Sequence, residues 1–247
     1  MNWTREAARK YDSWVQSRKG SFVLAQEKRL QQHLISFWPR RKQSLLEIGC
    51  GTGVFLEMFW EAGFDVTGVD ISPEMLSRAR HRMGKRADLH LAAAEHLPFD
   101  DKEFDFAALI TVLEFCPDPV AALREACRVS RKELFVAFLN RHSLYYHLAG
   151  RKSRKRKDST LRDTQWFSWL EMTSMLRRAV GKKSVYSRSV LATPPAMWTD
   201  NKICRFMGRP ILPPFMGAFI GMRVDILNKK PLNTPLMAFQ TEAKPDI

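Results

Sequence analysis

Apolar and polar residues follow two rhythms along the chain, and these rhythms divide it into three parts. Over residues 1–43 the apolar residues stand at helical spacing among charged ones, which predicts an amphipathic helical segment closed by Pro39. Its expected apolar anchors are Trp14, Phe22, Leu30, Leu34 and Phe37. Residues 44–140 alternate short apolar runs with longer amphipathic runs, and after Asn140 this alternation breaks up.

The central part, residues 44–140, predicts strands that alternate with helices. The expected strands are "SLLEIG", "FDVTGVD", "ADLHLAAA", "FDFAALIT" and "ELFVAFLN". Helices are expected at Val54–Ala62, Pro73–Met83 and Pro119–Val129, with proline at the first turn and Gly84 just beyond the end of the second. Such alternation implies βαβ units and a mostly parallel sheet, and the continuously apolar fourth strand should be buried on both faces.

The third part predicts one more helix and two more strands. "TQWFSWLEMTSMLRRAV" has the pattern of an amphipathic helix, while "KKSVYSRSVL" and "AFIGMRVDIL" have that of a sixth and a seventh strand. Between these strands, Pro194–Met216 is expected to be irregular and is rich in Pro, Met and aromatic residues. We therefore expect one α/β domain over residues 1–228 and a flexible tail over 229–247.

Charge adds a possible class of partner. The formal net charge is +14, and such a field favours polyanions or anionic membrane surfaces. Much of the excess lies in the run "GRKSRKRKDSTLR", densest at Arg151–Lys157. A clustered run is more typical of a solvated loop, so nucleic-acid binding is possible but not favoured. Peripheral contact with an anionic membrane stays a hypothesis, and the pattern does not indicate an oligomeric state.

Cysteine and histidine usage does not suggest a disulfide framework or a metal site. The four cysteines are scattered without a C-x-x-C pair, and the six histidines are dispersed without an H-E-x-x-H pattern. The N-terminus lacks an apolar signal-peptide region, and no apolar run approaches the ~18 residues that a membrane span needs. We expect a soluble cytoplasmic protein without a bound metal.

Three glycines in "LLEIGCGTGVFLEMF" suggest a ligand. Gly49, Gly51 and Gly53 lie between a predicted strand and a predicted helix, an arrangement that binds dinucleotides or related adenosine ligands. Val54 stands where the dinucleotide motif has its third glycine, and no P-loop Gly-Lys-Ser/Thr follows. Asp70 ends the next strand, where a carboxylate can accept both ribose hydroxyls, although it could also cap the following helix.

Four segments in this order resemble the successive motifs of class I S-adenosylmethionine-dependent methyltransferases. They are "LLEIGCGTGVFLEMF", "VTGVDISPEMLSRAR", "AAAEHLPFDDKEFD" and "ITVLEFCPDPVAALREACRV". The match is similar to the small-molecule type that includes the ubiquinone and menaquinone methyltransferases, and it covers roughly Tyr11 to Asn140. The resemblance implies a Rossmann-like seven-stranded sheet with helices on both faces. It divides the domain into a helical lid (1–43), a cofactor-binding core (44–140) and a substrate-side region with a C-terminal lid (141–228).

The resemblance implies S-adenosyl-L-methionine as cofactor and a role for each matching residue. Glu47 would orient the glycine loop or meet the methionine amino end, Asp70 would hold the ribose, and Tyr11 would fold over the cofactor. The remaining implied contacts are Gly49, Cys50, Gly51 and Gly53 beneath the methionine moiety, Ile71, Met75, Ala94 and Glu95 around the adenine, and Thr111 and Leu113 near the methyl group.

Two positions depart from the family pattern. Where the family often has Asp-Ala-Glu before "LPF", this chain has Ala93-Ala94-Glu95, so the adenine amino group would bond to a backbone group or to Glu95. The usual Lys-Pro-Gly-Gly turn before the fifth strand is replaced by "VSRKELFV". The first departure could weaken cofactor affinity, and the second alters only a turn.

A sulfonium methyl group is already activated, so a general base is needed only for a poorly ionised acceptor. Weak candidates are Glu114, His142, Tyr145, Tyr146 and His147, each of which could equally form ordinary local hydrogen bonds. The catalytic residues therefore stay unknown at this level. The apolar residues expected near the acceptor are Trp166, Trp169, Leu170 and Leu176, which helix packing explains better, and Met197, Trp198, Phe206, Met207, Phe215 and Met216, which are better pocket candidates.

Three functions remain open. The favoured one is a methyltransferase that acts on a small, apolar or aromatic acceptor. The second is an RNA or protein methyltransferase that uses the basic surface, although no RNA-methyltransferase signature or RNA-binding module is present. The third is a non-catalytic S-adenosylmethionine-binding protein, suggested by the missing adenine-binding acid and the lack of an identifiable base.

Overall fold

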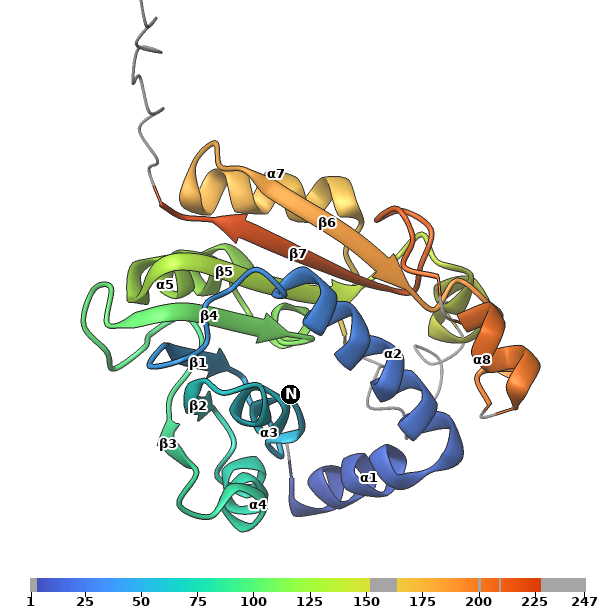
Figure 1. The fold of residues 1–247 in the computed structure, drawn as a ribbon, viewed down its shortest axis with the longest axis horizontal. Coiled ribbons are helices and arrows are strands. Elements are labelled where there is room, and N and C mark those ends of the chain that lie inside the picture. The colour runs from blue at the N-terminus through green and yellow to red at the C-terminus, as the bar shows by residue number, and fades with distance from the viewer. Residues whose placement is uncertain (1–3, 152–163, 200, 209, 228–247) are drawn as a thin grey trace, which may run out of the picture.

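A seven-stranded sheet forms the centre of the computed structural model (Figure 1), which describes residues 4–151, 164–199, 201–208 and 210–227, apart from the side chains of 203, 205 and 207. The strand order is β3-β2-β1-β4-β5-β7-β6, and only β7 runs antiparallel to its neighbours. The strands are β1 (Ser44–Ile48), β2 (Asp65–Asp70), β3 (Ala87–Leu91), β4 (Phe104–Ile110), β5 (Ser130–Leu139), β6 (Val185–Val190) and β7 (Phe219–Asp225).

Helices cover both faces of the sheet because successive strand residues point to opposite sides. Leu45, Phe106 and Phe135 join one buried cluster with the helices α2 (Arg18–Leu34), α3 (Val54–Glu61) and α4 (Pro73–Met83). Their neighbours in the strands, such as Leu46, join a second cluster with α5 (Pro119–Val129) and α7 (Trp169–Val180). The other elements are the helices α1 (Arg5–Gln16) and α8 (Lys202–Gly208), the short 3₁₀ helices η1 (Leu113–Phe115) and η3 (Pro195–Met197), and the π-helix η2 (Tyr146–Gly150).

Local sequence fixes where the core helices begin and end. The Ser72 hydroxyl accepts a hydrogen bond from the Met75 amide at the start of α4, and Gly84 closes that helix. Asp118 caps α5 in the same way. Ser168 and Glu171 form a reciprocal capping box at the start of α7, so the chain enters each helix at a defined angle.

The strand order places a crevice at the carboxyl ends of β1 and β4. β1 pairs with β2 on one side and with β4 on the other, so the chain leaves these two neighbouring strands in opposite directions. The connection after β1 leads into α3, and the connection after β4 leads into η1 and α5. In open α/β sheets this divergence is where ligands bind.

The sequence predicts the sheet and core helices well and the flanking parts less well. The seven-stranded, mostly parallel sheet with helices on both faces is confirmed. The N-terminal segment is two helices that break at Ser17, and two of its expected anchors, Trp14 and Phe37, are exposed by 39% and 84%. The expected irregular stretch Pro194–Met216 contains η3 and α8.

Other predictions fall outside the described residues or are not tested by the fold. Most of the basic run and the tail over 229–247 lie outside what the structure describes, and the division into functional regions stays a prediction. In the described part of the chain, no helix is both long enough and apolar enough to cross a membrane.

Candidate functional site

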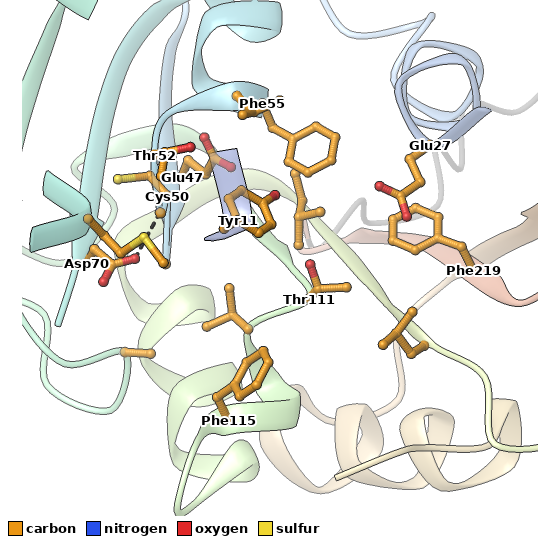
Figure 2. Close-up of a pocket in the computed structure, with 18 of the residues that line it drawn as sticks. Tyr11, Glu27, Glu47, Cys50, Thr52, Phe55, Asp70, Thr111, Phe115 and Phe219 are labelled. Carbon is orange, nitrogen blue, oxygen red and sulfur yellow. Dashed lines mark hydrogen bonds between the residues drawn. The ribbon is translucent and has the colours of Figure 1, made fainter. Parts of the chain in front are cut away.

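A cavity of about 600 Å³ opens at the carboxyl ends of the parallel strands (Figure 2). The loops that follow β1, β2 and β4 form one half of its lining, and α1 and α2 close over it from the N-terminal segment. The remaining wall comes from the loop after β3, the end of β5, the segment after β6 and the start of β7. Its size is in the range of small-molecule and cofactor sites.

The glycine loop brings backbone to the cavity surface. Gly49 has φ +71°, and a Cβ there would lie 2.4 Å from Val112 Cγ2, so only glycine fits at this crossing of the β1 and β4 loops. Gly51 has φ +54°, but a Cβ there would meet no heavy atom within 4 Å, because the residue borders the open cavity. The loop is anchored by the Cys50 amide, which donates to the Val69 carbonyl at 2.9 Å.

Asp70 at the end of β2 orients the loop and faces the cavity. Its Oδ2 accepts a hydrogen bond from the Gly51 amide and its Oδ1 accepts one from the Ser72 amide, each at 2.8 Å. Burial raises the pKa of Asp70 and outweighs these backbone hydrogen bonds, which favour the ionised form. Each oxygen keeps a lone pair for a further donor, so the carboxylate fits the two hydroxyls of a ribose.

Glu47 on β1 is a buried acid with an unsatisfied atom. Only 1% of the residue is exposed, yet it lines the cavity, and its Oε2 has no hydrogen-bond partner. Burial, followed by repulsion from Asp70, holds the pKa of Glu47 well above its ordinary value. An uncompensated buried carboxyl beside the cavity fits a ligand that supplies a positive charge, such as an amino group.

The predicted adenine side contains both apolar and acidic groups. Met75 in α4 is buried and Ile71 is 64% exposed, and both border the cavity together with Ala94. Glu95 also lines the cavity, and its Oε1 is buried without a hydrogen-bond partner. It is therefore placed to receive a donor where the family's usual acid is replaced by alanine.

Helix α1 covers the site and is fastened to the core by charge. Asp12 bonds to Arg78 on α4 and lies 3.8 Å from Arg82, whose Nε donates to the Thr52 carbonyl of the glycine loop at 2.9 Å. The preceding residue, Tyr11, lines the cavity. Burial and the nearby carboxyls of Glu27 and Glu47 raise the pKa of Tyr11. This helix therefore limits the access of water to the cavity.

The other end of the cavity is mainly apolar and carries backbone strain. Thr111 after β4 and Leu191 after β6 adopt φ values of +51° and +66°, which β-branched and bulky residues rarely do. Both residues line the cavity. The lining includes the aromatic residues Phe55, Phe115, Tyr145, Trp198 and Phe219, and Phe219 lies at the end of the drawn pocket away from Asp70 (Figure 2).

Most of the predicted cofactor residues meet at the cavity. Tyr11, Glu47, Gly49, Cys50, Gly51, Asp70, Ile71, Met75, Ala94, Glu95 and Thr111 are all in its lining. Gly53 and Leu113 are not: Gly53 precedes α3 in a left-handed conformation, and Leu113 is buried in the core with α5. Their roles in cofactor binding, like those of the residues in the lining, stay predictions.

The predicted catalytic candidates are mostly not brought to the cavity. His142 and His147 are exposed, and Tyr146 packs on Trp166 with ring centroids 5.1 Å apart. Glu114 is buried behind the lining, where its Oε1 accepts from the Leu139 amide at 2.7 Å and its Oε2 lacks a partner. Burial raises the pKa of Glu114 to about 8. Tyr145 lines the cavity, and burial raises its pKa as well.

The expected acceptor-side residues separate in the structure. Trp198 lines the cavity, and its Nε1 donates to the Thr193 carbonyl at 3.0 Å. Phe206, Phe215 and Met216 are exposed, Met197 lies outside the lining, and the side chain of Met207 lies outside what the structure describes. From the α7 region, Trp166 and Leu176 are buried, Trp169 is partly buried and Leu170 is exposed, so none of these four lines the cavity.

Sequence reasoning missed several lining residues, and Glu27 is the most notable. It extends from α2 into the cavity, at the other end of the drawn pocket from Asp70 (Figure 2). Phe55 in α3 and Phe219 in β7 also line the cavity, and neither residue was singled out from the sequence. The described residues contain no group of His, Cys, Asp and Glu side chains that could hold a metal ion.

Comparison with known proteins gives consistent results. Residues 46–138 match a family model described as a methyltransferase domain. The chain is 32% identical over 187 residues to an uncharacterized protein of Methanocaldococcus jannaschii, covering 75% of this chain and 83% of that one. It is 33% identical over 113 residues to a ubiquinone biosynthesis O-methyltransferase of Hydrogenovibrio crunogenus, covering 43% of this chain and only 47% of the relative.

The fold is also shared with solved structures. A methyltransferase from Thermotoga maritima, named as S-adenosylmethionine-dependent and as a possible histamine N-methyltransferase, superposes with a TM-score of 0.71 at 24% identity. The superposition covers 90% of this chain and 98% of that chain. Unlike the match to the ubiquinone enzyme, which covers less than half of this chain, this structural similarity covers most of it.

Proposed function

Because the chain belongs to the class I S-adenosylmethionine-dependent methyltransferases, we propose that it transfers the methyl group of this cofactor to a small acceptor with an apolar or aromatic body. The observation that carries the proposal is the two-ended cavity. One end gathers the glycine loop, Asp70 and Glu47, the opposite end carries Phe219, and further aromatic residues line the cavity (Figure 2). A cofactor and a small acceptor would thus share one enclosed space.

The residues of the cofactor end fit S-adenosylmethionine group by group. The Asp70 carboxylate offers acceptors for the ribose hydroxyls, and the unsatisfied Glu47 Oε2 offers one for the amino group. Gly51 leaves room for close approach of the ligand to the backbone. Met75 and Ile71 provide apolar surface for the adenine.

The bound cofactor supplies an activated methyl group, so the protein's main task is to hold the two reactants in line. Proximity and alignment can contribute roughly 7–11 kcal/mol to lowering the barrier. In this chain α1, held to α4 through Asp12, would close the cavity and exclude water. The rigid turns at Thr111 and Leu191 would fix the walls of the acceptor end.

The aromatic lining favours a small acceptor over RNA or a protein. Phe55, Phe115, Tyr145, Trp198 and Phe219 offer apolar surface in an enclosed space, which suits a compact molecule. Contact with nucleic acid or an anionic membrane rests on net charge alone and stays a prediction. Turnover with a small acceptor would rule out the third alternative, a non-catalytic binding protein.

Calorimetric titration of S-adenosylmethionine tests the cofactor site. We expect micromolar binding to the wild type and binding weaker by at least about thirtyfold in Asp70→Ala, because at least two charge-assisted hydrogen bonds are lost. Asp88→Ala is the matched control, since this exposed aspartate lies on the neighbouring strand β3 outside the cavity. Equal affinity in wild type and Asp70→Ala would mean that the cofactor does not bind here.

An acceptor screen then tests the second half of the proposal. Production of S-adenosylhomocysteine is measured with panels of small aromatic and aliphatic molecules, total RNA and denatured protein. We expect turnover with members of the small-molecule panels. Turnover with RNA or protein alone would contradict the assignment of the aromatic end to a small acceptor.

A further inference from the structure

Glu27 occupies a position where a charged residue is not expected. It lies on α2 one turn after Val23 and one turn before Leu30, on the helix face that packs against the sheet. The residue is only 8% exposed, and it lines the cavity at the aromatic end (Figure 2). Nothing in the cofactor-binding residues described above requires a carboxyl group at this place.

Within the described part of the chain, no group donates a hydrogen bond to Glu27 or forms an ion pair with it, and its carboxyl oxygens, unlike Glu47 Oε2 and Glu114 Oε2, are not fully buried. A largely buried carboxylate without such a partner destabilises the folded protein unless it takes up a proton. Asp70, by comparison, is held by two backbone amides. Glu27 is thus a polar group whose partner is missing from the protein itself.

The charged and titratable groups around Glu27 add negative rather than positive charge. The Glu114 carboxyl interacts with it from η1, while Tyr11 on α1 and Tyr145 after β5 interact with it as neutral hydroxyls. Two lysines of the N-terminal helices have other partners: Lys10, which also lines the cavity, pairs with Glu6 at 2.9 Å, and Lys19 Nζ lies 5.5 Å from the centroid of the Trp198 ring.

Burial, followed by repulsion from Glu114, raises the pKa of Glu27 to about 8. The side chain is therefore mostly protonated at neutral pH while the site lacks a cation. A positive charge beside it would favour the carboxylate and also relieve the repulsion between the two acids. A neutral hydroxyl could not do so, because it brings no charge.

The walls next to Glu27 suit the same kind of group. Tyr145 and Trp198 both line the cavity, with ring centroids 4.8 Å apart, and Phe219 lines it from β7. Aromatic faces attract cations, and a carboxylate beside them supplies the countercharge. Carboxylate and aromatic groups together are suited to an alkylammonium group attached to an apolar body.

We propose that Glu27 binds a protonated amino group of the methyl acceptor, so that the acceptors of this enzyme are amines with an aromatic or apolar body. This inference rests on the proposed function, because it assigns the aromatic end of the same cavity to the acceptor. Glu27 is then a substrate-binding residue that selects amines over neutral molecules of the same shape.

The test uses the full-length protein saturated with S-adenosylhomocysteine, so that no turnover occurs. Phenethylamine, benzylamine and their neutral counterparts phenethyl alcohol and benzyl alcohol are titrated by calorimetry at neutral pH, in two buffers of different ionisation enthalpy. We expect each amine to bind at least about tenfold more tightly than its alcohol. Amine binding should also release close to one proton, since Glu27 ionises when the ammonium binds.

Glu27→Gln keeps the size of the side chain and removes its charge. We expect it to abolish both the preference for amines and the proton release, while the affinity for S-adenosylhomocysteine stays the same. Glu61→Gln, an exposed glutamate at the end of α3, is the matched control and should behave as the wild type. Since no described group bonds to Glu27, the substitution should not prevent folding.

The outcomes separate the two proposals. If wild type binds S-adenosylhomocysteine but neither amine binds more tightly than its alcohol, the assignment of Glu27 is wrong. Proton release that persists in Glu27→Gln would also overturn it. If the wild type binds neither S-adenosylhomocysteine nor S-adenosylmethionine, the proposed function itself fails. The proton count of the wild type does not depend on how any variant folds.

Discussion

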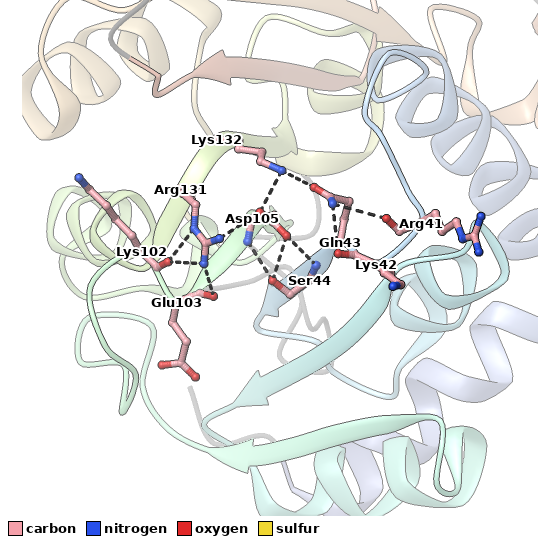
Figure 3. A network of polar contacts seen from close by, with 9 residues as sticks. All are labelled: Arg41, Lys42, Gln43, Ser44, Lys102, Glu103, Asp105, Arg131 and Lys132. Atoms are coloured by element: carbon pink, nitrogen blue, oxygen red, sulfur yellow. Dashed lines mark hydrogen bonds and ion pairs between the residues drawn. The ribbon is translucent and has the colours of Figure 1, made fainter.

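The two edges of the sheet hold buried carboxyl groups in opposite situations. At the amino ends of the parallel strands, Asp105 on β4 is surrounded by donors (Figure 3). It accepts from the Ser44 amide at 3.1 Å and lies 3.0 Å from Lys132 Nζ and 3.6 Å from Arg131 Nη1. At the carboxyl ends, Glu47 and Glu114 each have a buried oxygen without a partner, and Glu27 has no donor among the described residues.

The pKa of the acid at the amino ends is lowered, whereas the pKa values of the acids at the carboxyl ends are raised. Burial alone would raise the pKa of Asp105, but the hydrogen bond from Lys132 and that from the Ser44 amide outweigh it, so its pKa is lowered. Burial raises the pKa of Glu27 and of Glu114 to about 8. The amino edge thus uses an acid to stabilise the fold, whereas the acids at the carboxyl edge lower its stability and, in our proposal, bind a ligand.

The largest effect that we expect from this difference is a dependence of stability on pH. Glu27 and Glu114 keep their protons in the folded state up to about pH 8, whereas in the unfolded chain they lose them near the ordinary value of 4.5. Between these values the folded state binds more protons, so the free energy of unfolding falls as pH rises. We expect a loss of several kcal/mol across this range, measured by urea unfolding.

Glu114→Gln should flatten this dependence, because it removes one titrating acid and its repulsion of Glu27. Asp105→Asn should leave the slope unchanged, since a lowered pKa affects stability only in more acidic solution. If Glu114→Gln and the wild type lose stability equally between pH 5 and pH 8, then Glu114 is not protonated in the folded protein.

The second prediction concerns the amino edge itself. Asp105→Asn removes the countercharge of Lys132 and Arg131 and weakens the hydrogen bonds with Ser44. We expect the free energy of unfolding to fall by about 1.5–3 kcal/mol, because hydrogen bonds to a charged group are lost. The affinity for S-adenosylmethionine, measured by calorimetry, should change by less than about twofold. A large loss of affinity would mean that the two edges are coupled.

The sequence predicts a residue's position where a local pattern fixes it, and it fails where the position depends on tertiary packing. Gly49, Gly51, Asp70 and Glu47 were predicted at the cavity because each stands at a fixed point in a strand–loop–helix pattern, and such local patterns determine geometry. The same local patterns gave the bounds of α4 and α5, which begin at proline after a capping residue.

Glu27 could not be predicted in this way, because its position depends on how α2 packs against the sheet. A signal was nevertheless present: Glu27 interrupts the apolar stripe formed by Val23, Leu30 and Leu34. In an amphipathic helix a charge is usually assigned to solvent, and only tertiary packing shows that this one faces a cavity. Trp198 was a pocket candidate, but the sequence did not separate it from the exposed Phe215 and Met216.

The smallest change in stability is expected from alanine substitutions at two glycines, which should differ in their effect on ligand binding. Gly51 and Gly84 have φ values of +54° and +57°, and a Cβ at either position would meet no heavy atom within 4 Å. Alanine at either site should therefore cost about 1–2 kcal/mol in the free energy of unfolding, owing to backbone strain alone.

Only one of these two glycines borders the cavity. Gly51 lines it and donates its amide hydrogen to Asp70, while Gly84 closes α4 away from it. We expect Gly51→Ala to weaken binding of S-adenosylmethionine by at least about tenfold, because the added methyl group occupies space that the ligand needs. Gly84→Ala should bind as the wild type does. If both variants bind equally well, the open space beside Gly51 is not part of the cofactor site.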